Sequence, residues 1–291
     1  PYHMLSKIYF EITNVCNLSC PFCHGTRRAP SFLERENFLL LLEKIKGHAK
    51  YLYFHVLGEP LLHADLPDMM RAAKAAGFSV MLTTNGTLLC KRGEELLETG
   101  ALTKVSVSLQ ALESGGAEKI DDYLAVVSHF ARRCGEAGVI CVLRLWNEGS
   151  ESEKQNAMLI EKLHTLFPDE WIKNRSGFKL IASPRGQNEV YLEFDRRFAW
   201  PDVQSKKETG VRTCRALSDQ IGILCDGTVV PCCMDADGEI KLGNLYTQTL
   251  DEILSSPRAA ALLSSFQKGV PCEALCASCG YAARFSSKNK H

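Results

Sequence analysis

The stretch CNLSCPFC places three cysteines, Cys16, Cys20 and Cys23, directly after the strand-like run KIYFEIT. A zinc knuckle or buried thiols would be the alternatives, but a tetrahedral zinc site needs a fourth ligand, and His24 is the only candidate nearby. Three thiolates in a C-x3-C-x2-C loop can instead hold three irons of a four-iron, four-sulfur cluster. The fourth iron then lacks a protein ligand and is open to a substrate or cofactor, so we expect a catalytic metal centre.

The other cysteines are unevenly distributed over the 291 residues. The long middle of the chain has only Cys90, Cys134 and Cys141, which we expect to pack in the core, as we do Cys225. Disulfides are not expected, because the cytosol keeps thiols reduced and the chain is too large to need them. Two groups with a thiol-poor stretch between them favour metal binding, and the second group is Cys214, Cys225, Cys232, Cys233, Cys272, Cys276 and Cys279.

The elements that must position these groups alternate between strand and helix up to about residue 182. Mostly apolar strands of this kind are typical of a parallel sheet covered by helices, and six βα units predict an α/β fold with a partial (βα)6 TIM-like barrel. The strand-like runs are 7–13, 51–57, 78–84, 104–110, 139–146 and 177–182, and the helical patterns are 34–47, 65–76, 91–99, 118–137 and 152–167.

The regular alternation of strand-like and helical patterns ends after Pro184. A polar stretch rich in helix and strand breakers suggests a bridging segment, and ILCDGTVVPCC predicts a β-hairpin around Asp226-Gly227. A short helix, TLDEILSSPRAAALLSSF, and a cysteine-rich tail follow. We therefore predict two parts, a barrel over 1–183 and a bridging segment with a small hairpin and helix module over 184–291.

Polar residues follow the predicted strands, at the edge where the active site of a barrel or open parallel sheet lies. On strand one itself, Glu11 is a buried acid that needs a partner, and we predict that it contacts substrate. A buried arginine on strand five, Arg144, needs an anion for the same reason. His55 is either an interior histidine or a substrate contact, and Tyr9, Tyr53 and Arg212 are weaker candidates. The strand-end groups are Gly58-Glu59-Pro60, Thr84-Asn85-Gly86, Ser106, Ser108, Gln110, Arg144 and Asn147.

Charge and hydropathy limit the classes of function. Lysine plus arginine equals aspartate plus glutamate at 34 each, which argues against a general nucleic-acid binder. The longest apolar runs are too short to span a membrane. No signal-peptide pattern opens the chain, so we expect a cytoplasmic protein.

The cysteine loop, GEP after the second strand and SVSL at the fourth together resemble the radical S-adenosylmethionine (SAM) superfamily. The resemblance implies that Cys16, Cys20 and Cys23 hold a four-iron cluster whose open iron is chelated by SAM. It implies that Phe22 contacts the adenine, and that Gly58, Glu59 and Pro60 offer backbone groups to the ammonium of SAM. The resemblance also implies that Asn85, Ser106 and Ser108 bind the ribose and carboxylate of SAM. Arg144 would bind the same carboxylate.

The C-terminal cysteines resemble the auxiliary-cluster modules of that superfamily, known as SPASM and, in a shortened form, twitch. Cys214, Cys232, Cys276 and Cys279 follow the twitch order, and the resemblance implies a second four-iron cluster on them. A tetrathiolate also suits zinc, so zinc is the alternative. Cys233 and Cys272 are spare thiols that could replace a ligand.

The resemblance implies an enzyme, a lyase or an oxidoreductase, that reductively cleaves SAM to a 5′-deoxyadenosyl radical and abstracts hydrogen from a small molecule or nucleoside. A flavodoxin or ferredoxin-type protein would supply the electron. The length, the layout and the runs HVLGEPLLH, VLRLWN and FAWPD resemble short proteins that include the queuosine lyases of queuine salvage. The alternatives are a maturase that modifies a ribosomally made peptide and a non-catalytic iron–sulfur electron carrier.

Overall fold

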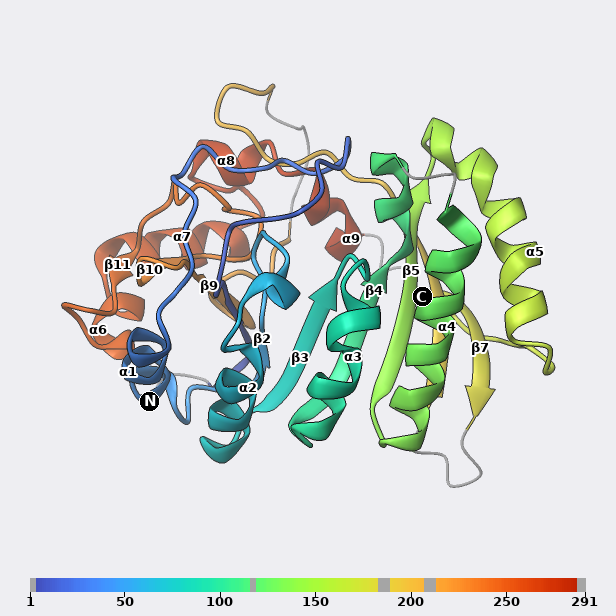
Figure 1. Cartoon of the computed structure of the whole chain (residues 1–291). Coiled ribbons are helices and arrows are strands. Elements are labelled where there is room, and N and C mark those ends of the chain that lie inside the picture. Colours follow the sequence, from blue (N-terminus) through green and yellow to red (C-terminus); the bar gives the residue numbers. More distant parts are fainter. Residues whose placement is uncertain (1–3, 116–118, 183–188, 207–212, 287–291) are drawn as a thin grey trace.

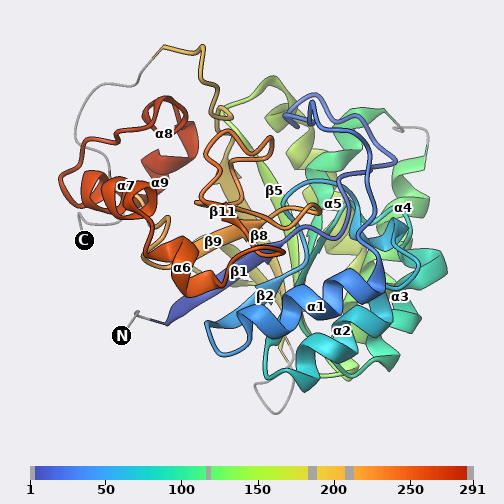
Figure 2. The same cartoon turned by 90° about the vertical axis from the view of Figure 1, so that its left-hand side faces the viewer.

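A computed structural model describes residues 4–115, 119–182, 189–206 and 213–286. One 11-stranded sheet runs through it in the order β11-β10-β9-β1-β2-β3-β4-β5-β8-β7-β6. The sheet is curved and not closed, and helices α1–α4 cover its outer face (Figures 1 and 2). The predicted α/β fold with a partial TIM-like barrel is therefore confirmed.

The strands of the barrel are parallel and follow one another in space. β1 pairs with β2, and the pairing continues through β3, β4 and β5 to β8, always in parallel. Each of the strands β1–β5 is followed by a helix that packs on the sheet, which explains why these five strands are mostly apolar. The bounds are β1 Leu5–Phe10, β2 Ala49–Tyr53, β3 Ser79–Thr84, β4 Leu102–Ser108, β5 Ile140–Glu148 and β8 Glu189–Arg196.

The helices match the predicted segments within a few residues. They are α1 Arg35–Ile45, α2 Leu66–Ala75, α3 Leu89–Glu98, α4 Ile120–Glu136 and α5 Asn156–Leu166. Short 3-10 helices follow three of the strands at the edge where the site lies: η1 Pro60–Leu62 after β2, η2 Leu109–Ser114 after β4, and η4 Glu151–Gln155 after β5.

The predicted sixth strand is wrong in its role. Residues Gly177–Ala182 form β7, which pairs antiparallel with β8 and with the short β6, Ile172–Lys173. The sixth parallel strand is β8, which lies in the stretch predicted to be a bridging segment. Its run EVYLEFDR has charged residues between apolar ones, as expected for a strand that is only half-buried, and so lacks the continuous apolar pattern of β1–β5.

The C-terminal part extends the same sheet. β9, Gln220–Ile223, pairs in parallel with β1, and β10, Thr228–Val230, forms the predicted hairpin with β9. β11, Gly243–Asn244, pairs with β10. The division at residue 184 stays a prediction, since one sheet runs through both parts.

One predicted C-terminal helix is two helices. α6, Leu250–Leu254, is capped by Thr249, and α7 starts at Pro257 after the Ser256 cap and ends at Gln267. Proline is favoured at the first position of a helix, where its missing N–H costs no hydrogen bond, and it prevents α6 from continuing. The last elements in the described part of the chain are α8, Ala274–Ala277, the 3-10 helix η5, Gly280–Ala282, and α9, Ala283–Ser286.

Candidate functional site

Two adjoining cavities lie at the carboxyl ends of the barrel strands. The first, here the cysteine cavity, has a volume of about 410 Å³, and its lining includes Cys16, Cys20, Cys23, Gly58, Glu59 and Asn85. The second, here the arginine cavity, has about 340 Å³ and includes Arg144 and Arg197 in its lining. Both are lined by Phe22, Cys23, His55, Thr83, Ser108 and Trp200, so the two share a wall.

The GEP turn lies directly against the start of the cysteine loop. Gly58 has φ +77°, and a Cβ there would stand 2.3 Å from the Thr13 carbonyl oxygen. The next residue, Glu59, donates its backbone N–H to the Val15 carbonyl at 2.8 Å. At position 58, only glycine tolerates both the positive φ and the close approach of the Thr13 carbonyl, because it has no side chain. The turn therefore fixes the position at which the cysteine loop leaves β1.

The Glu59 side chain joins the ends of two strands. Its carboxylate is buried and accepts hydrogen bonds from the Leu61 N–H (3.0 Å), the Thr84 hydroxyl (2.8 Å) and the Asn85 N–H (2.7 Å). Burial raises the pKa of Glu59, and these three donors oppose that rise. The carboxylate thus has its partners inside the protein. The backbone of Gly58-Glu59 is left facing the cysteine cavity, whereas Pro60 begins η1 and does not line it.

Asn85 connects the third strand to the first cysteine. Its side-chain amide donates to the Asn17 side-chain oxygen at 2.9 Å and lies 3.8 Å from the Cys16 Sγ. The Asn85 oxygen in turn accepts from the Thr87 N–H and hydroxyl. If Cys16 ligates a cluster as predicted, a fixed amide beside its sulfur is the kind of outer contact that orients metal ligands and tunes cluster potential.

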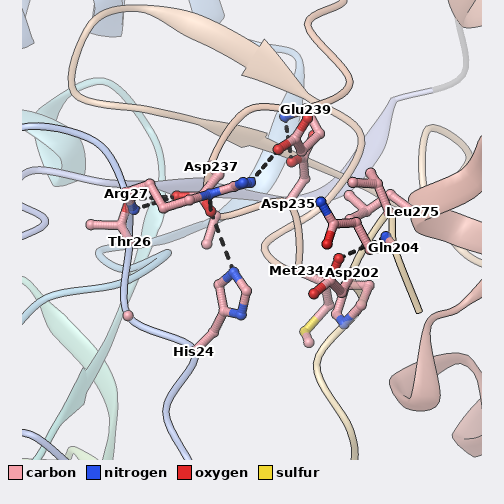
Figure 3. Close-up of a pocket in the computed structure, with 14 residues that line it drawn as sticks. His24, Thr26, Arg27, Asp202, Gln204, Met234, Asp235, Asp237, Glu239 and Leu275 are labelled. Carbon is pink, nitrogen blue, oxygen red and sulfur yellow. Dashed lines mark hydrogen bonds and ion pairs between the residues drawn. The ribbon is translucent and has the colours of Figure 1, made fainter.

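The other end of the cysteine loop is bound to the C-terminal part of the chain (Figure 3). The Asp237 carboxylate accepts from the Thr26 hydroxyl (2.7 Å) and from the Arg27 backbone N–H (2.9 Å) and Nε (3.0 Å), and it pairs with His24 at 3.4 Å. Partial burial alone would raise the pKa of Asp237, but these hydrogen bonds lower it to about 2. His24, the alternative zinc ligand, is thus engaged by Asp237 and stacked on Trp200.

Arg144 and Ser106 are not in the cysteine cavity. Arg144 is in the lining of the arginine cavity, where its guanidinium lies 4.4 Å from the centre of the Trp146 ring and its Nε lies 3.6 Å from Glu193. Ser106 is buried on β4 and lines neither cavity, whereas Ser108 lines both. The predicted contacts of Arg144 and Ser106 with SAM are therefore not supported by this arrangement, because neither side chain reaches the cavity beside the cysteines.

Glu11 does not line either cavity. Its side chain is fully buried, and both carboxylate oxygens accept from Arg28 Nη2, at 2.8 and 2.7 Å. One oxygen also accepts from the Cys225 N–H at 3.2 Å. The buried acid therefore has the partner that its burial requires, and that partner is Arg28 rather than a substrate. The predicted catalytic role of Glu11 is not supported by this geometry.

The C-terminal cysteines that were predicted as ligands lie around one hollow, lined by Cys214, Cys232, Cys276 and Cys279. The two spare thiols lie elsewhere: Cys233 lines the arginine cavity, and the exposed Cys272 is not in the lining of the hollow. Cys225, Cys134 and Cys141 are buried, as predicted, and Cys90 is exposed, so the prediction that it packs in the core is wrong.

Both cysteine groups supply thiols, the ligand type of iron–sulfur clusters. Burial raises the pKa of Cys16, Cys20, Cys214 and Cys232. Because thiolates are the ligating form, a cationic centre would offset the cost of ionising them together. In the described ranges, no three His, Cys, Asp or Glu side chains stand close enough to hold one metal ion.

Within the same described ranges, no helix is long and apolar enough to cross a membrane.

Sequence reasoning missed several residues of the arginine cavity. Arg197 follows β8, in the segment predicted to be a bridge; Lys7 and Thr83 lie on predicted strands but were not singled out. Trp146, Phe198, Trp200 and Tyr281 form much of the wall. The alternation of charged and apolar residues in EVYLEFDR is the signal that could have placed a strand, and hence Arg197, at this edge of the sheet.

Comparison with protein-family models shows the superfamily to which the chain belongs. A family model of the radical SAM superfamily matches residues 10–155, half of the chain, and the model of the SPASM iron–sulfur cluster-binding domain matches residues 214–280. The chain belongs to the radical SAM superfamily and carries a SPASM domain. Membership implies a four-iron, four-sulfur cluster and SAM as cofactors, and the SPASM domain implies additional iron–sulfur clusters. The shortened twitch form stays a prediction.

The chain is similar in sequence to curated proteins and in fold to solved structures. The chain is 25% identical over 192 residues to an Fe-coproporphyrin III synthase of Methanosarcina barkeri (63% of this chain, 46% of that protein). It is 34% identical over 116 residues to a probable GTP 3′,8-cyclase of Methanocella arvoryzae (38% and 36%). The chain thus spans less than half the length of these curated relatives. The crystal structure of BtrN in complex with AdoMet and 2-DOIA superimposes with a TM-score of 0.60 at 16% identity, over 96% of this chain and 94% of that one, which shows a shared fold.

Proposed function

We propose that this chain is an enzyme that uses SAM to abstract a hydrogen atom from a small molecule bound in the arginine cavity. The observation that supports it is the shared wall: Cys23 and Phe22 line both cavities, so a cofactor beside the cysteines and a substrate beside Arg144 would be neighbours. When bound, the cluster and SAM supply a 5′-deoxyadenosyl radical after a one-electron reduction. A flavodoxin or ferredoxin-type protein is the proposed source of that electron.

The chain's own residues would position and shield the reactants. Gly58 and Glu59 hold the start of the cysteine loop against Val15, and Asp237 holds its end. Within the shared wall, Trp200 donates its indole N–H to the Phe22 carbonyl at 2.9 Å. The loop that carries the ligands is thus held on three sides, which fits a site that must exclude water from a reactive intermediate.

A nucleoside substrate is the more specific proposal. The name of the Methanocella relative, a probable GTP 3′,8-cyclase, denotes a nucleotide substrate, and a cavity of about 340 Å³ is within the range that binds small ligands. Within this class we retain the queuosine lyase hypothesis, in which queuosine or its 5′-phosphate is cleaved to release queuine.

The test is an anaerobic incubation of the iron- and sulfide-reconstituted protein with dithionite and SAM, with and without queuosine. Formation of 5′-deoxyadenosine supports the enzyme, and release of queuine supports the lyase. 5′-Deoxyadenosine without queuine would remove the lyase hypothesis and leave other small molecules or a peptide as substrate. No 5′-deoxyadenosine under any condition would favour the electron carrier. A Cys23→Ala variant is the matched control for chemistry that does not depend on the loop.

A further inference from the structure

All the buried side-chain polar atoms that lack a hydrogen-bond partner in the described part of the chain line one cavity. They are His55 Nδ1, Thr83 Oγ1, Gln110 Oε1, Arg144 Nε and Arg197 Nε. Each belongs to a residue in the lining of the arginine cavity. Buried polar groups are nearly always hydrogen-bonded, because an unpaired one costs free energy. Five exceptions around one cavity indicate that a ligand supplies the missing partners.

The charge of the cavity favours an anion. Its described lining contains Lys7, Arg144 and Arg197 and no aspartate or glutamate. Two of these cations have close carboxylates behind them: Arg197 bonds Glu113 at 2.6 Å, and Lys7 lies 3.7 Å from Asp219. The carboxylate beside Arg144, Glu193, lies 3.6 Å from Arg144 Nε, beyond hydrogen-bond distance. The Arg144 side chain is 14% exposed, and its buried Nε has no hydrogen-bonded anion, so Arg144 is the cation that a bound anion would stabilise most.

The surroundings of Arg144 explain why Glu193 does not fill this role. Glu193 Oε2 lies 3.6 Å from Arg144 Nε, beyond hydrogen-bond distance, and it accepts instead from the Trp146 indole N–H at 3.2 Å. The Glu193 side chain is also 30% exposed, so water screens its charge. Burial lowers the pKa of Arg144, which reports the same missing stabilisation of its charge.

The remaining wall favours a flat molecule with neutral polar groups. Tyr9 and Tyr53 lie with ring centres 5.0 Å apart, and His55 packs edge-on against both. Burial and the nearby Arg144 lower the pKa of His55 to about 3, so its ring is neutral near pH 7 and can both donate and accept a hydrogen bond. Thr83 and Gln110 add a hydroxyl and an amide oxygen. Aromatic side chains pack well against a planar ring, with their centres a few ångströms apart.

We propose that the arginine cavity binds a small molecule with a planar ring and one carboxylate or phosphate group, and that Arg144 is the ligand of that anion. This inference rests on the proposed function, because it names the substrate class of the same site. It differs from the SAM-carboxylate role predicted from the sequence, since Arg144 faces the second cavity.

The test measures binding and needs no turnover. Equilibrium dialysis of the anaerobic, reconstituted protein would use benzoate, phenyl phosphate and benzamide, which is a neutral isostere of benzoate. We expect at least one anion to bind about tenfold more tightly than benzamide or better, as a charge-assisted hydrogen bond to a buried arginine implies. Whichever of benzoate and phenyl phosphate binds more tightly identifies the anion. Equal binding of benzamide and both anions would overturn the proposal without the use of a variant.

Two substitutions and a control test whether Arg144 is responsible for the preference for the anion. Arg144→Met should abolish the preference for the anion, and Arg144→Lys should retain part of it; Arg71→Met, at an exposed arginine on α2, should change nothing. SAM binding is measured on the same samples and should be unchanged in Arg144→Met. Loss of SAM affinity would instead assign Arg144 to the cofactor. Because these arms do not require 5′-deoxyadenosine, failure here and failure of the proposed function can be told apart.

Discussion

The Asp237 carboxylate accepts a 2.7 Å hydrogen bond from the Thr26 hydroxyl, which joins the SPASM domain to the loop that carries Cys16, Cys20 and Cys23. The two residues are 211 positions apart in the chain. The contact means that the position of the cysteine loop depends on the C-terminal domain, and the first prediction derives from it.

Asp237→Asn should destabilise the protein by on the order of 2 kcal/mol at pH 7, because the folded-state pKa of Asp237 is about 2 and that of an unfolded aspartate about 3.9. A depressed carboxyl pKa stabilises the fold above about pH 4 and loses this contribution as the pH falls towards 2. The difference between Asp237→Asn and the unsubstituted protein in urea unfolding should therefore shrink between pH 6 and pH 3. An unchanged difference over this range would contradict the assignment, and Asp169→Asn, at an exposed aspartate, is the control.

Gly58→Ala should be far more damaging than Gly47→Ala. Both glycines have positive φ, +77° and +80°, so both substitutions cost roughly 1–2 kcal/mol of backbone strain. At Gly47 the new methyl group meets nothing within 4 Å, whereas at Gly58 it would overlap the Thr13 carbonyl oxygen. We expect a further loss of about 1–3 kcal/mol and less iron bound at the cysteine loop. Chemical denaturation and iron analysis of both variants measure this, and equal effects at the two sites would refute the close approach.

Glu11→Gln separates a structural role from a catalytic one. Breaking the buried pair with Arg28 should cost about 3–5 kcal/mol, because it leaves a buried charge without its partner. The fraction that stays folded should still form 5′-deoxyadenosine at the unsubstituted rate. Normal stability with lost product formation would restore the catalytic role predicted from the sequence. Glu36→Gln, at a side chain that is 79% exposed, is the control.

The local features of the site could be predicted from the sequence, and the long-range ones could not. The cysteine loop and the GEP turn depend on residues adjacent in sequence, so spacing and residue type were sufficient to predict them. The partners of Glu11 and Arg144 depend on which distant segment packs opposite each. Arg28 is 17 residues from Glu11, and the arginine cavity combines residues as far apart as Lys7 and Tyr281.

β8 shows a second limit of the sequence. Gly177–Ala182 and Glu189–Arg196 are both strand-like, and only the pairing with β5 decides which of them is the parallel strand. Because β8 pairs with β5, Arg197 lies at the site and Gly177–Ala182 lies further towards the edge of the sheet. Strand propensity cannot make the choice, because it depends on the neighbours of a strand more than on its own residues.

We predict that Cys276→Ala lowers the iron content of the reconstituted protein from about eight to about four irons per chain, because Cys276 is a predicted ligand of the predicted second four-iron cluster. Cys272→Ala should leave the iron content unchanged, since Cys272 is exposed and does not line the hollow formed by the other four cysteines. If Cys272→Ala lost iron and Cys276→Ala did not, the ligand assignment would have to be exchanged.

The central claim is that the three-cysteine loop leaves one iron free for SAM, and electron paramagnetic resonance tests it most directly. In the Cys276→Ala variant, which we expect to keep only the cluster of the cysteine loop, the dithionite-reduced signal should change its g-values when SAM is added. The same spectrum with and without SAM, or no four-iron signal from the cysteine loop at all, would contradict the account.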